Sequence, residues 1–231
     1  VKRNIFPKVL NDIKLYYIEY FDYFMNQKNS LGLHSCFLDL DDPLELFKIW
    51  MVEAEKKEIN DPNALSLATA NDKKQPSVRM ILLKGYSHEG FIFYTNLNSP
   101  KSKDLKINPQ AAMCFHWKSL ERQVRILGNI TPVSDNEAND YFDSRPYESK
   151  ISAWASDQSR VMTEKNDLIK NIENFESKHP DKEKVPRPKH WSGWCLKPIS
   201  IEFWLGREFR IHERLKYKKI SNKWEKEILY P

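Results

Sequence analysis

Three basic side chains alternate near the C-terminal end of the chain, in the stretch RIHER: Arg210, His212 and Arg214. In a β-strand successive side chains point to opposite faces, so a strand here places all three on one face, downstream of Trp204. Like charges that share a face repel one another unless an anion offsets them. The pattern therefore predicts an extended segment that binds an anionic ligand.

A second candidate anion site lies in the stretch TNLNSPKSKDL. Ser99 is typical of a helix N-cap, Pro100 suits the first helical position, and Lys101 falls in the opening turn. Free backbone N–H groups at a helix N-terminus, together with a lysine, suit a phosphate group. A solvated loop is the alternative interpretation, and this stretch alone favours it.

Arg79 and Lys84 bracket an apolar run in SVRMILLK. Arg79 is a candidate to bind a phosphate and Lys84 a second polar group. However, the period of two sends them to opposite faces unless the strand bends. Two strand-end charges that extend into water are an equally good interpretation.

Further polar candidates follow a predicted helix over residues 134–144. This helix and its exit place Tyr141 and Arg145 four residues apart on one face, and Ser149 lies beyond the terminating proline. An arginine at a helix C-terminus also complements the helix dipole, which is the structural alternative. Gln158 and Ser159 lie in a polar loop and suit either a ligand or a turn.

The elements that must position these residues are mainly strands. Alternating apolar patterns and short polar connections predict an antiparallel sheet or barrel with interleaved helices, an α+β fold. The first expected helix has Asp42 as its cap with Glu45 completing a capping box, and ends near Lys57. Strands are expected over residues 64–70, 77–86, 90–96, 111–117, 120–131, 194–206, 208–217 and 222–229, and further helices after residue 99, from Ser134 and over residues 163–177.

The composition of the 231-residue chain limits the function classes. A hydrophobic content of 40%, with 13% aromatic residues, is ample for a packed core, and neither a membrane span nor a secretory signal is predicted. Cys36, Cys114 and Cys195 form no CxxC pair, so neither a disulfide framework nor a metal site is indicated. The net charge of +5 arises from scattered lysines, which argues against a nucleic-acid groove. We expect a soluble, intracellular protein.

Seven motifs occur in an order that resembles the pyridoxamine (pyridoxine) 5′-phosphate oxidase family, FMN enzymes of the split-barrel class. They span about residues 42–231 and read DPLELF, RMILLK, FYTN, LERQVR, YFDSRP, SKISAWASDQS and IEFWLGREFRIHER. The resemblance implies an antiparallel split β-barrel with flanking helices as a single FMN-binding domain over residues 43–231. Residues 1–42 are then an N-terminal accessory segment, and the protein is a cytoplasmic homodimer with FMN at the interface.

The resemblance also implies roles for individual residues. The FMN-binding residues are Arg79, Met80, Ile81, Leu82, Lys84, Tyr94, Thr95, Ser99, Lys101, Gln123, Gln158, Ser159, Trp204 and Arg214. The substrate-binding residues are Lys84, Tyr141, Arg145, Ser149, Arg210 and His212, of which Arg210 and His212 are also the catalytic pair.

The implied reaction is hydride transfer from C4′ of pyridoxamine or pyridoxine 5′-phosphate to the flavin, followed by reoxidation with dioxygen to give hydrogen peroxide. A split-barrel protein that binds FMN or pyridoxal phosphate with little turnover is the alternative. Three positions depart from the family pattern. Pro100 replaces an arginine, Ser152 replaces a glycine, and no Arg-x-x-Tyr arm is found before DPLELF. The aromatic stretch from Tyr16 to Phe24 is then a candidate cover for the substrate.

Overall fold

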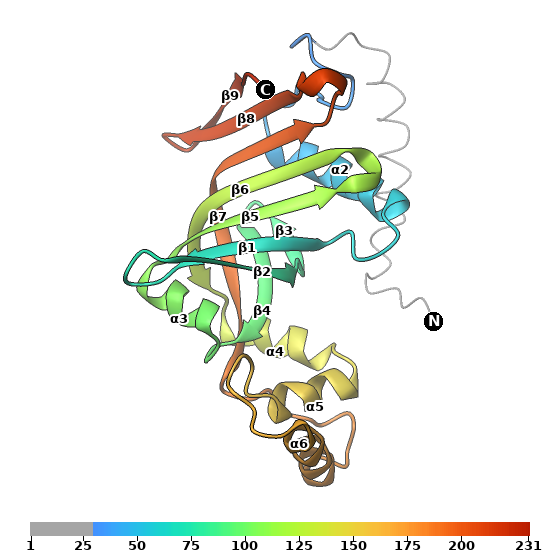
Figure 1. Cartoon of the computed structure of the whole chain (residues 1–231), viewed down its shortest axis with the longest axis vertical. Helices are drawn as coiled ribbons and strands as arrows, with labels where there is room; N and C mark the ends of the chain where they lie inside the picture. Colours follow the sequence, from blue (N-terminus) through green and yellow to red (C-terminus); the bar gives the residue numbers. More distant parts are fainter. Residues whose placement is uncertain (1–29) are drawn as a thin grey trace.

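The computed structural model describes residues 30–231, which form one curled antiparallel sheet with helices on one face and at one end (Figure 1). Residues 1–29 of the predicted accessory segment, with the aromatic stretch from Tyr16 to Phe24, lie outside the described residues. The strands are β1 (Ala64–Ala70), β2 (Pro76–Leu82), β3 (Gly85–Ser87), β4 (Gly90–Asn96), β5 (Gln110–Trp117), β6 (Arg122–Pro132), β7 (Trp191–Leu205), β8 (Glu213–Ile220) and β9 (Lys223–Ile228). The α-helices are α2 (Pro43–Lys57), α3 (Pro100–Ile107), α4 (Asp135–Asp143), α5 (Tyr147–Ala155) and α6 (Lys165–Lys178).

The long strand β7 divides the sheet into two parts. On one side it pairs with β6 along nearly its whole length, from Trp194 to Leu205. On its other side, residues 191–196 pair with β4, whereas residues 200–205 pair with β8. The strand order is therefore β2-β1-β5-β6-β7-β4-β3, with β8 and β9 added at the far end of β7. The predicted α+β antiparallel architecture is confirmed.

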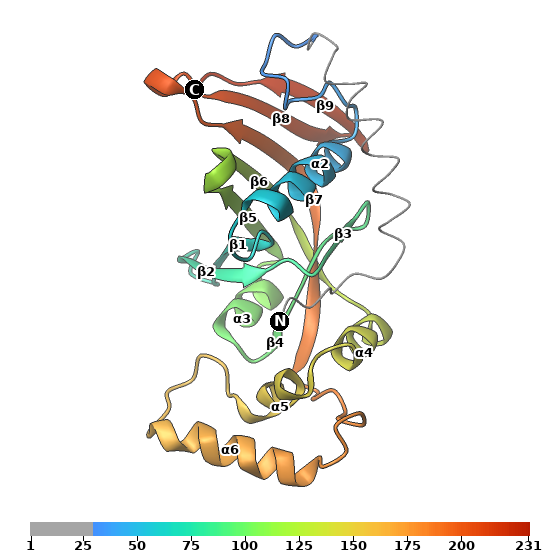
Figure 2. The same ribbon diagram turned by 90° about the vertical axis from the view of Figure 1, so that its right-hand side faces the viewer.

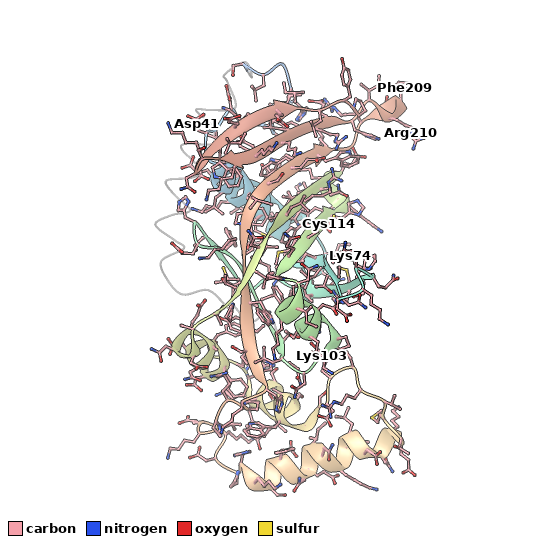
Figure 3. The ribbon with its side chains drawn as sticks, turned by 90° about the vertical axis from the view of Figure 1, so that its left-hand side faces the viewer. Asp41, Lys74, Lys103, Cys114, Phe209 and Arg210 are labelled. Atoms are coloured by element: carbon pink, nitrogen blue, oxygen red, sulfur yellow. The ribbon has the colours of Figure 1, made fainter. Side chains whose placement is uncertain are left out.

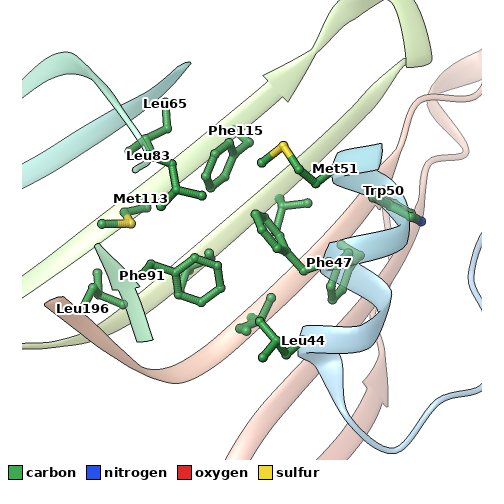
Figure 4. Packing of buried hydrophobic residues seen from close by; sticks show 14 of the residues in the cluster. Leu44, Phe47, Trp50, Met51, Leu65, Leu83, Phe91, Met113, Phe115 and Leu196 are labelled. Carbon is green, nitrogen blue, oxygen red and sulfur yellow. The ribbon is translucent and has the colours of Figure 1, made fainter. Parts of the chain in front are cut away.

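Helix α2 covers one face of the sheet and closes the hydrophobic core (Figure 4). Phe47 lies at its centre, with ring centroids 5.0 Å from Phe91 and 5.3 Å from Phe115, both edge-on. Trp50 contacts Phe203 in the same way at 5.1 Å. Because aromatic edge-to-face contacts have preferred geometries, this packing fixes how α2 lies on the strands that carry the candidate residues.

The helix starts largely follow the sequence. The Asp42 side chain caps α2 and accepts a hydrogen bond from the backbone N–H of Leu44 at 2.9 Å. Ser134 caps α4 through the N–H of Glu137. The expected cap at α3 is different, because the hydroxyl of Ser99 donates to the carbonyl of Asn96 at 2.7 Å and does not cap the helix.

Helices α4, α5 and α6 gather beyond the end of the sheet that β4 and β7 share (Figure 2). They surround a second cluster of buried side chains, whose members are Phe142, Ile151, Val185 and Trp191. Among the described residues no helix is both long and apolar enough to cross a bilayer.

The segment RIHER is not a strand over most of its length, so the prediction of one cationic strand face is wrong. Residues 208–210 form a 3₁₀ turn in which Phe209 and Arg210 have left-handed backbone angles (φ of 54° and 63°), and β8 begins only at Glu213. Two consecutive left-handed residues turn the chain away from the extended path. The alternation of charges therefore coincides with a turn, and only Arg214 of the three lies in a strand.

Candidate active site

Lys101, in the first turn of α3, is a buried cation with neutral partners. Its side-chain nitrogen donates to Thr95 Oγ1 and Ser99 Oγ, both at 3.2 Å, and to Gln158 Oε1 at 3.3 Å. Gln158 also accepts from Thr95 Oγ1 at 3.0 Å, which joins the loop after α5 to the end of β4. Burial and the nearby charge of Arg79 lower the pKa of Lys101. The sequence-predicted loop residues thus come together around one positive charge.

Arg79 lies on β2 beside this group. Its guanidinium donates to the Thr69 hydroxyl at 2.8 Å, to the Leu67 carbonyl at 3.1 Å and to the Ser77 hydroxyl at 2.6 Å. Burial lowers the pKa of Arg79, and the charge of Asp104 partly opposes this shift. Arg79 and Lys101 therefore form a cationic pair at the start of α3. In Figure 3, α3 carries the labelled Lys103 and lies next to β1, the strand that leads into the turn at Lys74.

A stack of parallel rings forms the second part of the site. The rings of Tyr94 and Tyr141 are 4.0 Å apart and 9° from parallel, and Trp191 lies 5.3 Å from Tyr94 and 6.2 Å from Tyr141. The guanidinium carbon of Arg145 lies 4.7 Å from the centroid of Trp191. Tyr141 and Arg145, which the sequence placed on one face, are thus both positioned against β4 and β7.

Arg145 carries an unused hydrogen-bond donor. Its Nη1 atom is buried and has no hydrogen-bond partner among the described residues. Burial lowers the pKa of Arg145 and also that of Lys84, for which the positive charge of Arg145 is the second cause. A buried donor without a partner costs about 1–3 kcal/mol, more when it is charged. Such a group is well suited to receive an anion.

Lys84 reaches this group because the strand does bend. Strand β2 ends at Leu82, and the backbone N–H of Lys84 instead bonds the carbonyl of Ile92 on β4 at 2.8 Å. The expectation that Arg79 and Lys84 point to opposite faces of the sheet applies only to a continuous strand. Beyond the bend, Lys84 lies near Arg145, whereas Arg79 lies near Lys101. The two cations of this segment therefore belong to different groups.

These four cations share one property. Within residues 30–231, none of Arg79, Lys84, Lys101 and Arg145 has a carboxylate oxygen within 4.0 Å. Buried charges are normally paired. Lys101 is buried and the other three are half-buried, so two groups of such cations without carboxylate partners favour two anion sites.

A third group of candidates lies on β6, β7 and β8. Trp204 is the cross-strand neighbour of both Gln123 and Arg214, and its ring lies 4.7 Å from that of His212. His212 Nδ1 accepts from the backbone N–H of Arg207 at 3.1 Å. Four predicted site residues, Gln123, Trp204, His212 and Arg214, therefore lie together on this part of the sheet. His212 belongs to the segment before β8 and not to the strand.

The carboxylate of Glu202 fixes Arg214 in this third group, and Glu202 was not predicted as a site residue from the sequence. Its carboxylate accepts from Arg214 Nε at 2.9 Å and also from Arg125, and its side chain is only 8% exposed. Burial raises the pKa of Glu202, but the hydrogen bonds from the two arginines outweigh this and lower it overall. A signal was present, since Glu202 and Trp204 alternate in IEFW and so share a face with Arg214.

Arg210 stands apart from the other candidates. Its side chain is exposed at the tip of the 208–210 turn, where Figure 3 shows it projecting with Phe209 from the end of the molecule opposite α6. Arg145 lies on Trp191, the first residue of β7, whereas the 208–210 turn follows the last residue, Leu205, about 45 Å away along the strand at the usual rise per residue. The single chain therefore does not bring Arg210 to Arg145.

The remaining candidates lie at the edges of these groups. Met80 and Leu82 point outward from the edge strand β2, 65% and 37% exposed, whereas Ile81 faces the core cluster. Ser149 is in the first turn of α5, just after Arg145. Ser159 is exposed and has a left-handed φ of 67°. Pro100 occupies the first position of α3, as predicted.

Comparison with known proteins agrees with this site. Residues 51–179 match the family model described as pyridoxamine 5′-phosphate oxidase, and residues 191–231 match the pyridoxine 5′-phosphate oxidase C-terminal dimerisation region. The chain belongs to the pyridoxamine 5′-phosphate oxidase family. A pyridoxine/pyridoxamine 5′-phosphate oxidase of Pelagibacter ubique is 58% identical over 208 residues, 90% of this chain and all of that protein. Its counterpart in Sinorhizobium fredii is 48% identical over 84% of this chain and 95% of its own.

Solved structures confirm the fold. PhzG from Burkholderia lata 383, in complex with tetrahydrophenazine-1-carboxylic acid, superposes with a TM-score of 0.80 at 26% identity, covering 89% of this chain and all of PhzG. A pyridoxamine 5′-phosphate oxidase-related, FMN-binding protein from Nostoc punctiforme has a TM-score of 0.67 at 16% identity, covering 82% and 98%. The predicted split-barrel fold and the oxidase function of the family are thereby confirmed.

Proposed function

We propose that the chain oxidises pyridoxamine 5′-phosphate and pyridoxine 5′-phosphate to pyridoxal 5′-phosphate, with FMN and substrate phosphates bound by separate cation groups. The single observation that carries this assignment is the absence of carboxylate partners, within residues 30–231, around four cations that are at least half-buried. Two phosphate-bearing ligands require two such groups.

The Arg79–Lys101 group fits the phosphate of FMN. Lys101 supplies a charge at the opening turn of α3, where Pro100 has no backbone N–H and those of Ser102 and Lys103 bond the carbonyl of Ser99. Ser99, Thr95 and Gln158 hold the ammonium group from three sides, so it needs little reorganisation to meet an anion. A dianionic phosphate would offset the burial of both cations. These residues therefore fit the cofactor.

The Lys84–Arg145 group fits the phosphate of the substrate. The unpartnered Arg145 Nη1 needs an acceptor, and the mutual repulsion of the two cations falls when an anion lies between them. Tyr141 stacks on Tyr94, which joins this group to the strand that also carries Thr95. Ser149 follows in the first turn of α5. Substrate is thereby held next to the FMN site.

The chemistry of the reaction comes from the cofactor, and the protein orients the reactants. When bound, FMN supplies the hydride acceptor for C4′ of the substrate and the route by which two electrons reach dioxygen, giving hydrogen peroxide. Arg210 contacts the substrate ring near C4′, and His212 helps to position the ring or its substituents. Gln123, Trp204 and Arg214 bind the flavin end of FMN. Correct placement of reacting atoms supplies several kcal/mol of the rate acceleration.

The complete site is composite, formed between two copies of the chain. Trp191 beneath Arg145 and the 208–210 turn lie at opposite ends of β7 in one chain, so Arg210 and His212 of one subunit serve the Lys84–Arg145 group of the other. The match of residues 191–231 to a dimerisation region supports a homodimer. The outward, apolar residues Met80 and Leu82 on β2 give this interface a hydrophobic part.

We place the enzyme in the cytoplasm. The three cysteines Cys36, Cys114 and Cys195 are free thiols, which fits a reducing compartment. A purified sample tests the function. It is expected to be yellow from bound FMN and to form hydrogen peroxide on addition of pyridoxamine 5′-phosphate. A yellow protein that forms no peroxide and no pyridoxal 5′-phosphate would instead establish the binding protein with little turnover.

A further inference from the structure

Trp191 lies directly beneath the guanidinium group of Arg145. The guanidinium carbon is 4.7 Å from the centroid of Trp191 and 5.5 Å from that of Phe142. No carboxylate within residues 30–231 pairs with Arg145, and its Nη1 donor stays without a partner. Among the described residues, aromatic faces are therefore the groups that hold this buried charge in place.

Trp191 is itself firmly fixed. It is the first residue of β7, is only 7% exposed, and its backbone N–H donates to the carbonyl of Pro188 at 3.0 Å. Its own carbonyl accepts from Arg187 Nη1 at 2.7 Å, and its ring packs edge-on against Phe142 at 5.1 Å. The ring that supports Arg145 is thus held through both backbone and side chain.

The same ring also aligns Tyr141, the second proposed ligand of the substrate phosphate. Trp191, Tyr94 and Tyr141 lie within 9° of parallel. A shift of the indole would therefore move the phenol of Tyr141 as well as the guanidinium of Arg145. These two side chains come from the end of α4 and the residues after it, whereas Trp191 comes from the sheet.

An aromatic face and a carboxylate have different effects on an arginine that must bind an anion. A carboxylate pairs with the N–H donors and cancels the charge, so a phosphate must compete with it. An indole face attracts the cation through its π electrons and leaves the in-plane donors available. Arg214 in this chain shows the first arrangement, since Glu202 accepts from its Nε. Arg145 shows the second.

We propose that Trp191 is a positioning residue for the substrate phosphate: its indole holds Arg145 and Tyr141 in place while leaving the charge and donors of Arg145 for the phosphate. This inference rests on the proposed function, because it takes Arg145 as a ligand of that phosphate. It assigns Trp191 no contact with substrate or with FMN.

The test compares Trp191→Leu and Trp191→Phe with Trp154→Leu in FMN-loaded enzyme. Trp154 is a matched control because it packs in the same cluster but lies tilted against Phe175 at 5.5 Å and makes no cation–π contact with Arg145. The measured quantities are kcat and KM for pyridoxamine 5′-phosphate, the inhibition constant of inorganic phosphate, and the dissociation constant of FMN.

We expect Trp191→Leu to raise both KM and the phosphate inhibition constant by about tenfold, which is the range of a desolvated cation–π contact. Trp191→Phe is expected to raise both by about threefold, because a phenyl ring keeps part of the attraction. In both variants kcat and FMN affinity stay within about twofold of wild type, since the indole contacts neither reacting group. Trp154→Leu is expected to leave both phosphate-dependent constants unchanged.

Two results would overturn the inference. One is an unchanged phosphate inhibition constant in Trp191→Leu, or in Trp191→Phe if the leucine variant does not fold. The other is an equal effect of Trp154→Leu, which would make Trp191 a general packing residue. Arg145→Ala separates this failure from failure of the proposed function. If Arg145→Ala weakens phosphate binding and Trp191→Leu does not, only the inference is wrong, whereas no effect of Arg145→Ala removes the phosphate site itself.

Discussion

Two regions of the molecule hold arginines and lysines in opposite ways. On β6–β8 and the connection after β7, Arg214 and Arg125 share the carboxylate of Glu202, and Arg207 pairs with Glu213 at 2.8 Å. The cations around β2, β4 and α3–α5 have other neighbours. Arg79 and Lys101 donate to hydroxyl, carbonyl or amide oxygens, and Arg145 lies over an aromatic ring. Lys84 is close enough to Arg145 to be repelled by its charge.

The difference indicates what each region does. An arginine paired with a carboxylate has a fixed orientation, and the pair has little net charge. Such an arginine suits orientation of a flavin or a substrate ring. An unpaired buried cation is costly in the free protein and gains most when an anion arrives. We therefore read the first region as orienting the reactants and the second as binding the two phosphates.

The largest expected effect is at Arg210, in the exposed turn beside the orienting region. In FMN-loaded Arg210→Ala, anaerobic flavin reduction by pyridoxamine 5′-phosphate should slow by about 100-fold, because the group that places C4′ against the flavin is lost. Arg210→Lys should recover little, since an ammonium lacks the planar guanidinium. Stopped-flow absorbance measures the rate. Reduction at the wild-type rate and affinity would remove Arg210 from the active site.

Arg145→Ala tests the binding region. Loss of charge-assisted hydrogen bonds worth about 1.5–3 kcal/mol should raise KM for pyridoxamine 5′-phosphate by about 10- to 100-fold. FMN should stay bound, because Lys101 and its partners are untouched. Steady-state kinetics and the flavin absorbance of the purified variant measure both. A colourless variant would show that Arg145 belongs to the FMN site instead.

Glu202→Gln should lower the free energy of unfolding by about 1–2 kcal/mol near neutral pH, less than for a fully buried pair because Arg125 is 46% exposed. The pKa of Glu202 is lowered in the folded protein, so its contribution is full above the ordinary value of about 4.3 and disappears as the pH falls through the folded value. Urea unfolding at several pH values measures this. Asp135, whose carboxylate is 86% exposed in its pair with Arg187, serves as control, and Asp135→Asn should cost less than about 1 kcal/mol. An equal loss at every pH would contradict the charge-based explanation.

The smallest effect has the opposite sign. Lys84→Met should stabilise the FMN-free, substrate-free protein by about 0.5–1 kcal/mol, because it removes a half-buried charge repelled by Arg145. The same variant should bind substrate more weakly. Thermal unfolding of the protein freed of FMN gives the first quantity and KM the second. Destabilisation of the free protein would show that Lys84 is not a strained cation, and the contrast between the two regions would weaken.

Much of the fold follows from local sequence signals. Strands such as residues 64–70 and 90–96 have clear boundaries, and the caps at Asp42 and Ser134 involve side chains only two or three residues from their partners. The strand prediction was wrong for residues 208–212 because alternating charges are compatible with both a strand and a turn. Nothing in the local sequence signals two left-handed residues at Phe209 and Arg210.

The site was only partly predictable, for a related reason. Tyr141 and Arg145 are close in sequence, so their joint placement could be expected. The supports of the site, Trp191 beneath Arg145 and Glu202 beside Arg214, depend on strand pairing between distant segments. Lys84 joins Arg145 only because the chain leaves β2 at Leu82 and pairs with β4. Long-range contacts of this kind are set by the whole sheet.

The central claim, a site shared between two copies of the chain, is tested most directly by mixing two variants that are each strongly impaired at low substrate concentration. Arg145→Ala and Arg210→Ala are unfolded together in equal amounts, refolded with FMN and assayed for hydrogen peroxide formation, with each variant refolded alone as control. If the two arginines of a site come from different subunits, each mixed dimer contains one intact site, and about a quarter of wild-type activity returns on random pairing. If the mixture is no more active than the variants alone, both arginines come from the same subunit and the composite site is wrong.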